Sequence, residues 1–243
     1  SIDSAVDIAK ETADIILLEK DLMVLEEGVL EGRRTFGNII KYIKMAASGN
    51  FGNMISVIAA SVFLPFLPML PVQILTQNLL CDFSQMGIPF DRVDQEYLKK
   101  PHKWETKSIK NFMAFFGPLS SIFDLLCFAV MWWAVGANRT ELSPLFQCGW
   151  FVFGTVSQVL VIHMIRTEKL PFIHSRSSMP LLISTCIVAI LAVVIGFTNF
   201  SVGFDMRPLP LHFVPWLVVI LAGYLICVQM LKKVYMKRYQ EWM

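Results

Sequence analysis

Apolar blocks separated by short polar stretches follow one another along the chain after residue 41. Six blocks approach the ~20 residues with which a helix crosses a bilayer. They comprise residues 42–63, 72–88, 112–135, 145–165, 181–197 and 213–231. A large soluble helical protein needs polar helix faces, and these blocks leave almost none. The pattern therefore predicts an all-α polytopic membrane protein with six transmembrane helices over residues 42–243, of which the second and fifth are short.

The first 40 residues differ in character from the blocks. They carry nine acidic residues before Thr35, and their apolar residues have amphipathic spacing. Ser4 followed by Asp7 resembles a capping box, which predicts a helix from Ser4, and the apolar run 13–18 favours a strand. Residues 1–21 are therefore predicted to be a short cytoplasmic α/β remnant, the end of a soluble domain.

A long stalk helix is predicted to join this remnant to the membrane. Asp21 can cap a helix that begins at Leu22. No proline occurs between Leu22 and Leu64, so the stalk, residues 22–41, can continue into the first block as a rod of roughly 65 Å. The alternative is two helices joined near Gly37.

Charge supports a membrane location and predicts an orientation. Only 16% of residues are charged, whereas a soluble domain carries about 25%. Of the 21 Lys and Arg residues, only Arg139 and Arg207 lie in the loops 136–144 and 198–212. This asymmetry places both ends of the chain in the cytoplasm. The lysine-rich loop 91–110 is explained by the same rule, or by contact with anionic membrane lipids.

Two acidic residues, Asp82 and Asp124, lie well inside the apolar blocks. A carboxylate is costly inside a bilayer and needs a function or a partner. Asn78, Asp82 and Gln85 are spaced i, i+4 and i+7, which places two amides and a carboxylate on one helix face. This polar face is the strongest candidate for a site within the membrane.

The first block carries a similar polar face. Asn50 and Asn53 share one side of the predicted helix, and Ser48 precedes them. A short turn joins the first two blocks, so they are antiparallel and their polar faces can meet near the middle of the membrane. Amide and carboxylate oxygens suit a hard cation such as Mg²⁺ or Ca²⁺. The alternative is that these side chains only hydrogen-bond the helices together.

Other polar residues receive weaker assignments. Ser48, Gln85 and Asp124 are candidates for supporting the cation ligands, and for Asp124 we favour helix packing with hydroxyl partners. The cysteines lie inside the blocks without CxxC spacing and predict neither disulfides nor a metal site. The tryptophans are expected to lie at the membrane interface; these are Trp132, Trp133, Trp150, Trp216 and Trp242.

These segments together resemble the C-terminal portion of P-type cation-transporting ATPases, most closely the bacterial magnesium-transporting (magnesium-importing) kind. The N-terminal segments AVDIAK (5–10), ADIIL (13–17) and EGR (31–33) resemble the end of the phosphorylation domain and the stalk. SGNFGN (48–53) and QNLLCD (77–82) resemble the ion-site segments of the fifth and sixth membrane helices. The closer match to magnesium pumps rests on FGP (116–118), SIFD (121–124), FQCGWF (146–151), VIHMIRT (161–167) and PFI (171–173).

The resemblance implies that the six blocks are membrane helices five to ten of an ATP-driven pump in a bacterial inner membrane. It implies cation binding by Asn50, Asn53, Asn78 and Asp82, with Asp82 and Asn78 as metal ligands. Mg²⁺ would be the transported ion and, in the full-length protein, the partner of ATP. The remaining partner would be the N-terminal part of the same pump, with membrane helices one to four and the actuator and nucleotide-binding domains. No nucleic acid is expected.

Two departures from the family pattern limit these expectations. Calcium pumps place a Glu at the position of Asn53, and some relatives carry a Glu near Phe153, so Asp82 is left as the one carboxylate and a single cation per cycle is expected. The chain also has no Asp-Lys-Thr-Gly motif and no nucleotide-binding segment, so alone it is not expected to hydrolyse ATP. A six-helix channel or secondary transporter that needs no ATP is the alternative.

Overall fold

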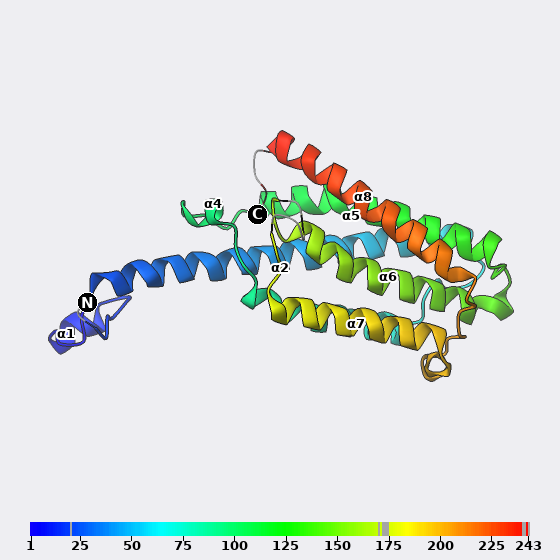
Figure 1. The fold of residues 1–243 in the computed structure, drawn as a ribbon, viewed down its shortest axis with the longest axis horizontal. Helices are drawn as coiled ribbons and strands as arrows, with labels where there is room; N and C mark the ends of the chain where they lie inside the picture. Colours follow the sequence, from blue (N-terminus) through cyan, green and yellow to red (C-terminus); the bar gives the residue numbers. More distant parts are fainter. Residues whose placement is uncertain (20, 170, 172–174, 240–241, 243) are drawn as a thin grey trace.

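The structure, a computed structural model, describes residues 1–19, 21–169, 171, 175–239 and 242. A helical bundle holds most of these residues, and one long helix projects from it (Figure 1). The helices of the bundle are α2 (Leu22–Phe63), α3 (Pro71–Gln85), α5 (Thr106–Ala129), α6 (Ser143–Ile165), α7 (Met179–Phe197) and α8 (Phe213–Tyr239). Two short helices, α1 (Asp7–Glu11) and α4 (Gln95–Leu98), lie outside it.

Helix α2 is continuous, so the single rod is the alternative that the structure shows. The predicted cap is confirmed, because the Asp21 carboxylate accepts a hydrogen bond from the Met23 amide at 2.9 Å. The helix ends before the extended Leu64, and the prolines that follow prevent its continuation. Its N-terminal half projects from one end of the bundle, which we call the stalk end (Figure 1).

The expectation for the first 21 residues was wrong in detail. No capping box forms at Ser4, and α1 begins instead at Asp7 after an extended Val6. Residues 2–5 form a turn, in which the Ala5 amide donates to the Ile2 carbonyl at 2.9 Å. Of the predicted strand, only an isolated bridge between Leu17 and Ile2 is present among the described residues.

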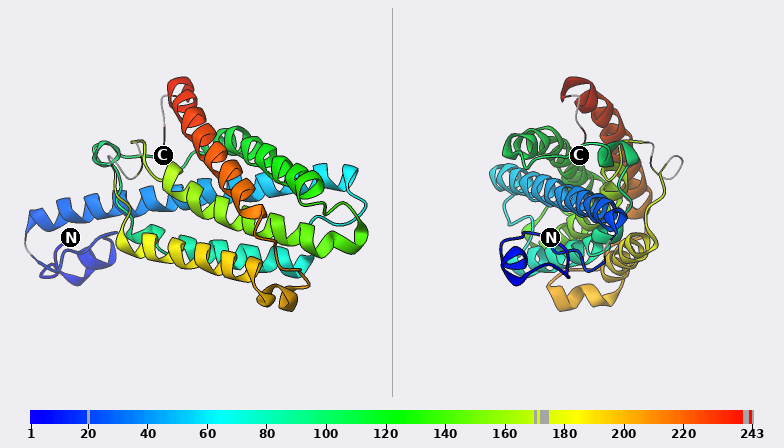
Figure 2. Two further views of the ribbon diagram at one scale, coloured as in Figure 1. Left: turned by 45° about the vertical axis from the view of Figure 1, so that its right-hand side comes forward. Right: turned by 90° about the vertical axis from the view of Figure 1, so that its left-hand side faces the viewer.

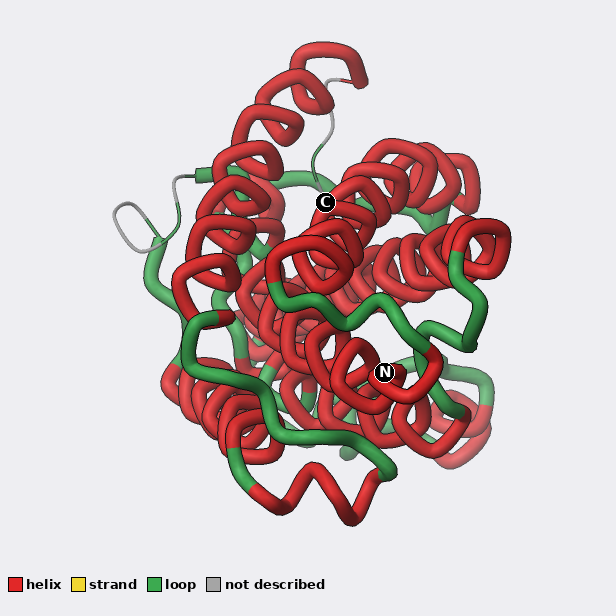
Figure 3. Tube along the Cα trace, turned by 90° about the vertical axis from the view of Figure 1, so that its right-hand side faces the viewer, coloured by secondary structure: helices red, strands yellow, loops and turns green. Residues whose placement is uncertain are grey.

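The bundle is built around α6. This helix packs against α3, α5, α7 and α8. Figure 2 shows it among them, and Figure 3 shows the helices of the bundle from the end opposite the stalk. In an apolar segment of 18 residues within α6, 78% of the residues are buried in the bundle. The corresponding share is 22% to 39% in the four other described helices that are long and apolar enough to cross a membrane. The outer helices therefore keep one apolar face uncovered by this chain, as membrane helices do.

The number of membrane crossings is only partly settled by helix length. Five helices have the length and composition for a crossing in the described part of the chain. Helix α3, which corresponds to the second predicted block, has 15 residues. It runs antiparallel to α2 and packs on α6 and α7 (Figure 1). A sixth crossing by α3 stays a prediction.

Candidate cation-binding site

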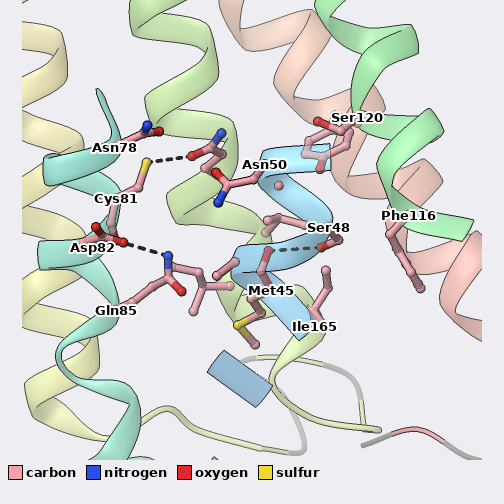
Figure 4. Close-up of a pocket in the computed structure, with 16 residues that line it drawn as sticks. Met45, Ser48, Asn50, Asn78, Cys81, Asp82, Gln85, Phe116, Ser120 and Ile165 are labelled. Carbon is pink, nitrogen blue, oxygen red and sulfur yellow. Dashed lines mark hydrogen bonds between the residues drawn. The ribbon is translucent and has the colours of Figure 1, made fainter. Parts of the chain in front are cut away.

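A cavity of about 160 Å³ lies among α2, α3 and α6, with α5 and α8 also lining it, and it reaches the last residues of α3 and α6, Gln85 and Ile165. Each helix contributes polar side chains, and Figure 4 shows Asn50 on α2 facing Asn78 and Asp82 on α3. One water needs only about 10–15 Å³ of such space, so the cavity has room for several waters or a hydrated ion. The polar residues that line it are Ser48, Asn50, Asn78, Asp82, Gln85, Ser120 and Gln158.

Asp82 is the one carboxylate among the residues that line the cavity. Its side chain is exposed, and none of the ion pairs formed by the described residues includes it. One turn further along α3, the Gln85 amide nitrogen donates to the Cys81 carbonyl at 3.4 Å. The Gln85 amide oxygen is buried without a hydrogen-bond partner among the described residues. The cavity thus offers, among the described residues, a carboxylate without an ion-pair partner and a buried amide oxygen without a hydrogen-bond partner.

Helix α6 contributes an amide that the sequence analysis had not assigned to this site. The Gln158 amide oxygen accepts a hydrogen bond from the Cys81 thiol at 2.7 Å, which ties α6 to α3 beside Asp82 (Figure 4). No group of three or more His, Cys, Asp or Glu side chains suited to a metal ion occurs within the described residues. A cation held here would therefore be bound mainly by amide oxygens and water around one carboxylate.

The structure brings most, but not all, of the predicted site residues together. Asn50, Asn78 and Asp82 line the cavity, as do the candidate supporting residues Ser48 and Gln85. Asn53 is half-buried and does not line the cavity.

The next part of α2 is fixed against α5. The Gly52 carbonyl accepts a hydrogen bond from the Ser121 hydroxyl at 2.8 Å. A Cβ atom at Gly52 would lie 3.0 Å from the Gly117 carbonyl oxygen. This close approach of the two helices depends on a residue without a side chain at this position.

Asp124 lies outside the cavity and has two protein partners. Its carboxylate accepts a hydrogen bond from the Ser56 hydroxyl at 2.6 Å and one from the Trp150 indole N–H at 2.9 Å. These bonds join α5 to α2 and to α6. They also hold the Trp150 side chain inside the bundle, where it is only 2% exposed.

A buried charge cluster at the stalk end was missed by the sequence analysis. The Asp91 carboxylate accepts hydrogen bonds from Arg166 at 2.9 Å and from Lys41 at 3.3 Å. Its side chain is fully buried, and its backbone carbonyl accepts a hydrogen bond from the Asn38 amide at 3.0 Å. Asp91 thus connects the segment after α3 to α2 and to the end of α6. The sequence offered no signal for this cluster, since its members lie far apart along the chain.

The cavity, its single carboxylate and the apolar helices define a membrane domain with a candidate cation site, and comparison with known proteins identifies the family of this domain. The family described as cation-transporting ATPase, C-terminus, matches residues 66–234, and the chain belongs to this family. It is 58% identical over 239 residues to the magnesium-transporting ATPase, P-type 1, of Escherichia coli K12, covering 98% of this chain and 27% of that protein.

Other relatives are likewise matched over only part of their own length. The magnesium-transporting ATPase, P-type 1, of Salmonella typhimurium 14028s is 56% identical over 98% of this chain and 26% of its own length. A calcium-transporting ATPase of Bacillus subtilis is 28% identical over 39% of this chain and 11% of its own length. The chain therefore spans about a quarter of the length of the magnesium-transporting relatives.

Proposed function

We propose that this chain is the transmembrane transport segment of an ATP-driven P-type pump that imports Mg²⁺, and that the cavity holds part of the transport site. The observation that carries the proposal is the open cavity that Asp82, Asn50 and Asn78 line together. The 58% identity to a magnesium-transporting relative over 98% of the chain supports the proposal.

The ligands suit Mg²⁺ in particular. Mg²⁺ gives up its water reluctantly and is usually held by one or two carboxylates together with several waters. In the proposed site Asp82 supplies the negative charge, while the amide oxygens of Asn50 and Asn78 accept hydrogen bonds from bound water or coordinate directly. A single carboxylate corresponds to one cation per cycle. Asn53 stays in the proposed set as a contributor that reaches the ion only when α2 moves.

Helix α2 is the proposed lever of the pump. It is continuous from Leu22 to Phe63, so a displacement at its projecting end is transmitted to Asn50. Under this proposal residues 1–21 are the end of the phosphorylation domain, residues 22–41 are the stalk, and phosphorylation in the preceding part of the pump moves them. Alternating access then follows as the ligands on α2 shift relative to Asp82 on α3.

The missing part of the pump has a natural place on α2 and α3. Large apolar side chains are exposed on both helices, including Met54 and Ile58 on α2 and Leu79 and Phe83 on α3. In the proposed pump, membrane helices one to four cover this face and complete the cation site. Both ends of the chain are proposed to lie in the cytoplasm of a bacterium, with residues 91–110 next to anionic lipid headgroups of the inner membrane.

The test is cation-stimulated ATP hydrolysis and Mg²⁺ uptake by the full-length protein carrying Asp82→Asn or Asp82→Ala. Both activities are expected to be lost while membrane insertion is retained. The matched control is Asp205→Asn, because Asp205 is an exposed carboxylate at the opposite end of the bundle with a left-handed backbone that Asn tolerates. Normal uptake with Asp82→Ala would overturn the site. Uptake without ATP would favour the alternative, a channel or secondary transporter.

A further inference from the structure

Trp242, which follows α8 in the sequence, is buried in the bundle. Its side chain is 7% exposed. Its indole N–H donates to the Ile165 carbonyl at 2.9 Å, and its own carbonyl accepts a hydrogen bond from the Lys44 ammonium at 3.1 Å. The residue is therefore bonded both to the end of α6 and to α2.

Aromatic rings from two helices enclose the indole. Its centroid lies 5.7 Å from that of Phe112 and 5.8 Å from those of Phe116 and Tyr235, each in an edge-to-face arrangement. The ammonium of Lys232 lies 5.4 Å from the ring centroid. Edge-to-face ring pairs and a cation over a ring are both attractive. The contacts come from α5 and α8, so Trp242 touches four helices of the bundle.

The indole lies in the wall between two cavities. Its contact residues Phe116 and Ile165 line the cation cavity together with Asn50 and Asp82. Trp242 itself lines a second cavity of about 540 Å³ at the stalk end, together with Lys44. A single side chain thus backs the stalk-end wall of the cation cavity.

Lys44 gives Trp242 a direct connection to the cation ligands on α2. It lies one turn before Ser48 and less than two turns before Asn50 in the same uninterrupted helix. Lys44 is buried, and its bond to the Trp242 carbonyl holds this part of α2 next to the end of α6. When the Trp242 side chain is removed, Phe116 loses its ring contact, and the backbone carbonyl that Lys44 binds loses the indole hydrogen bond to Ile165 that holds it in place.

We propose that Trp242 is a positioning residue for cation binding: it fixes the stalk-end wall of the cavity and the α2 turn that carries Asn50, and so sets the affinity for the transported cation. The proposal rests on the proposed function of the cavity. Its consequence is that a side chain that touches no ion controls how much Mg²⁺ the pump needs.

The experiment measures Mg²⁺-stimulated ATP hydrolysis of the full-length protein as a function of Mg²⁺ concentration, with ATP held as its saturating Mg²⁺ complex. Trp242→Ala is expected to raise the Mg²⁺ concentration for half-maximal stimulation at least about fivefold, in the range of typical coupling between sites. The maximal rate is expected to stay within about twofold, since no group that touches the ion or the substrate is lost. Trp242→Phe keeps a ring in the cage and is expected to restore most of the affinity.

Two controls separate positioning from general damage. Trp216→Ala removes the same side chain from α8 at a position that is 45% exposed, and its affinity should equal that of the parent. Lys44→Met removes the second bond and should lower the affinity in the same direction as Trp242→Ala. If Trp242→Ala does not fold, Trp242→Phe and Lys44→Met carry the test, and parental affinity in both overturns the proposal.

Each remaining outcome has a definite meaning. Parental affinity with Trp242→Ala overturns the proposal, and so does a lower maximal rate at unchanged affinity, which is the signature of a structural role alone. Asp82→Asn is measured in parallel. Stimulation that survives Asp82→Asn overturns the proposed cation site itself. Both proposals are supported if Asp82→Asn abolishes Mg²⁺ stimulation and Trp242→Ala, measured separately, lowers the affinity for Mg²⁺.

Discussion

Neutralising Asp91 is expected to loosen the stalk end of the bundle more than any other single change of charge. In Asp91→Asn the shape of the side chain is kept, but Lys41 and Arg166 lose their shared carboxylate. Both cations are buried, with side chains 4% and 2% exposed. Breaking a buried ion pair by removing one partner costs about 3–5 kcal/mol, because the remaining charge is left without compensation.

This magnitude can be measured as local opening. About 3 kcal/mol corresponds to more than a hundredfold change in an equilibrium constant. Where exchange follows the opening equilibrium, amide hydrogens of residues 86–98 should therefore exchange more than about a hundred times faster in Asp91→Asn. Hydrogen exchange followed by mass spectrometry on the full-length protein measures this rate. Adding Lys41→Met to Asp91→Asn should restore part of the protection, since one uncompensated cation is removed.

The matched control is the exposed ion pair between Lys169 and Glu96, whose nitrogen and oxygen lie 3.5 Å apart. Glu96→Gln should leave the exchange rates unchanged, because solvent screens an exposed pair. Exchange at the parental rate in Asp91→Asn would refute the argument that this cluster holds the segment after α3 in place.

Three further predictions concern packing and the edge of the proposed site. Asp124→Asn should retain most of the transport activity, because the amide still accepts the Trp150 hydrogen bond, and a loss as complete as that of Asp82→Ala would place Asp124 on the ion pathway. Gly87→Ala should lower the thermal unfolding midpoint of the full-length protein, since its Cβ would overlap the backbone of Leu181; overpacking of this kind costs about 1–3 kcal/mol. Gly28→Ala, with nothing within 4 Å of its Cβ, should raise helix stability by about 0.5–1 kcal/mol, and a midpoint as low as that of Gly87→Ala would contradict the steric reasoning.

Features that depend on a single helix could be predicted from the sequence. The spacing of Asn78 and Asp82 places both on one face whatever surrounds the helix, and both line the cavity. The cap at Asp21 is equally local and is confirmed. The capping box at Ser4 failed because a turn between Ile2 and Ala5 competes for the same residues.

Features that join distant segments could not be predicted in this way. The cluster around Asp91 and the docking of Trp242 depend on contacts between helices that only the folded bundle brings together. The sequence also did not show that Trp150 and Trp242 are buried, because the hydrogen-bond acceptor of each indole lies on another helix of the bundle. Periodicity shows which face of a helix is polar, but not which partner that face meets.

The most direct test of the central claim is a structure of the full-length protein with Mg²⁺ trapped in the membrane domain. A cation is expected between Asn50, Asn78 and Asp82, either about 2.0–2.1 Å from a carboxylate oxygen of Asp82 or separated from it by one ordered water. A transported cation bound elsewhere, with Asp82 touching neither the ion nor its water, would contradict the account.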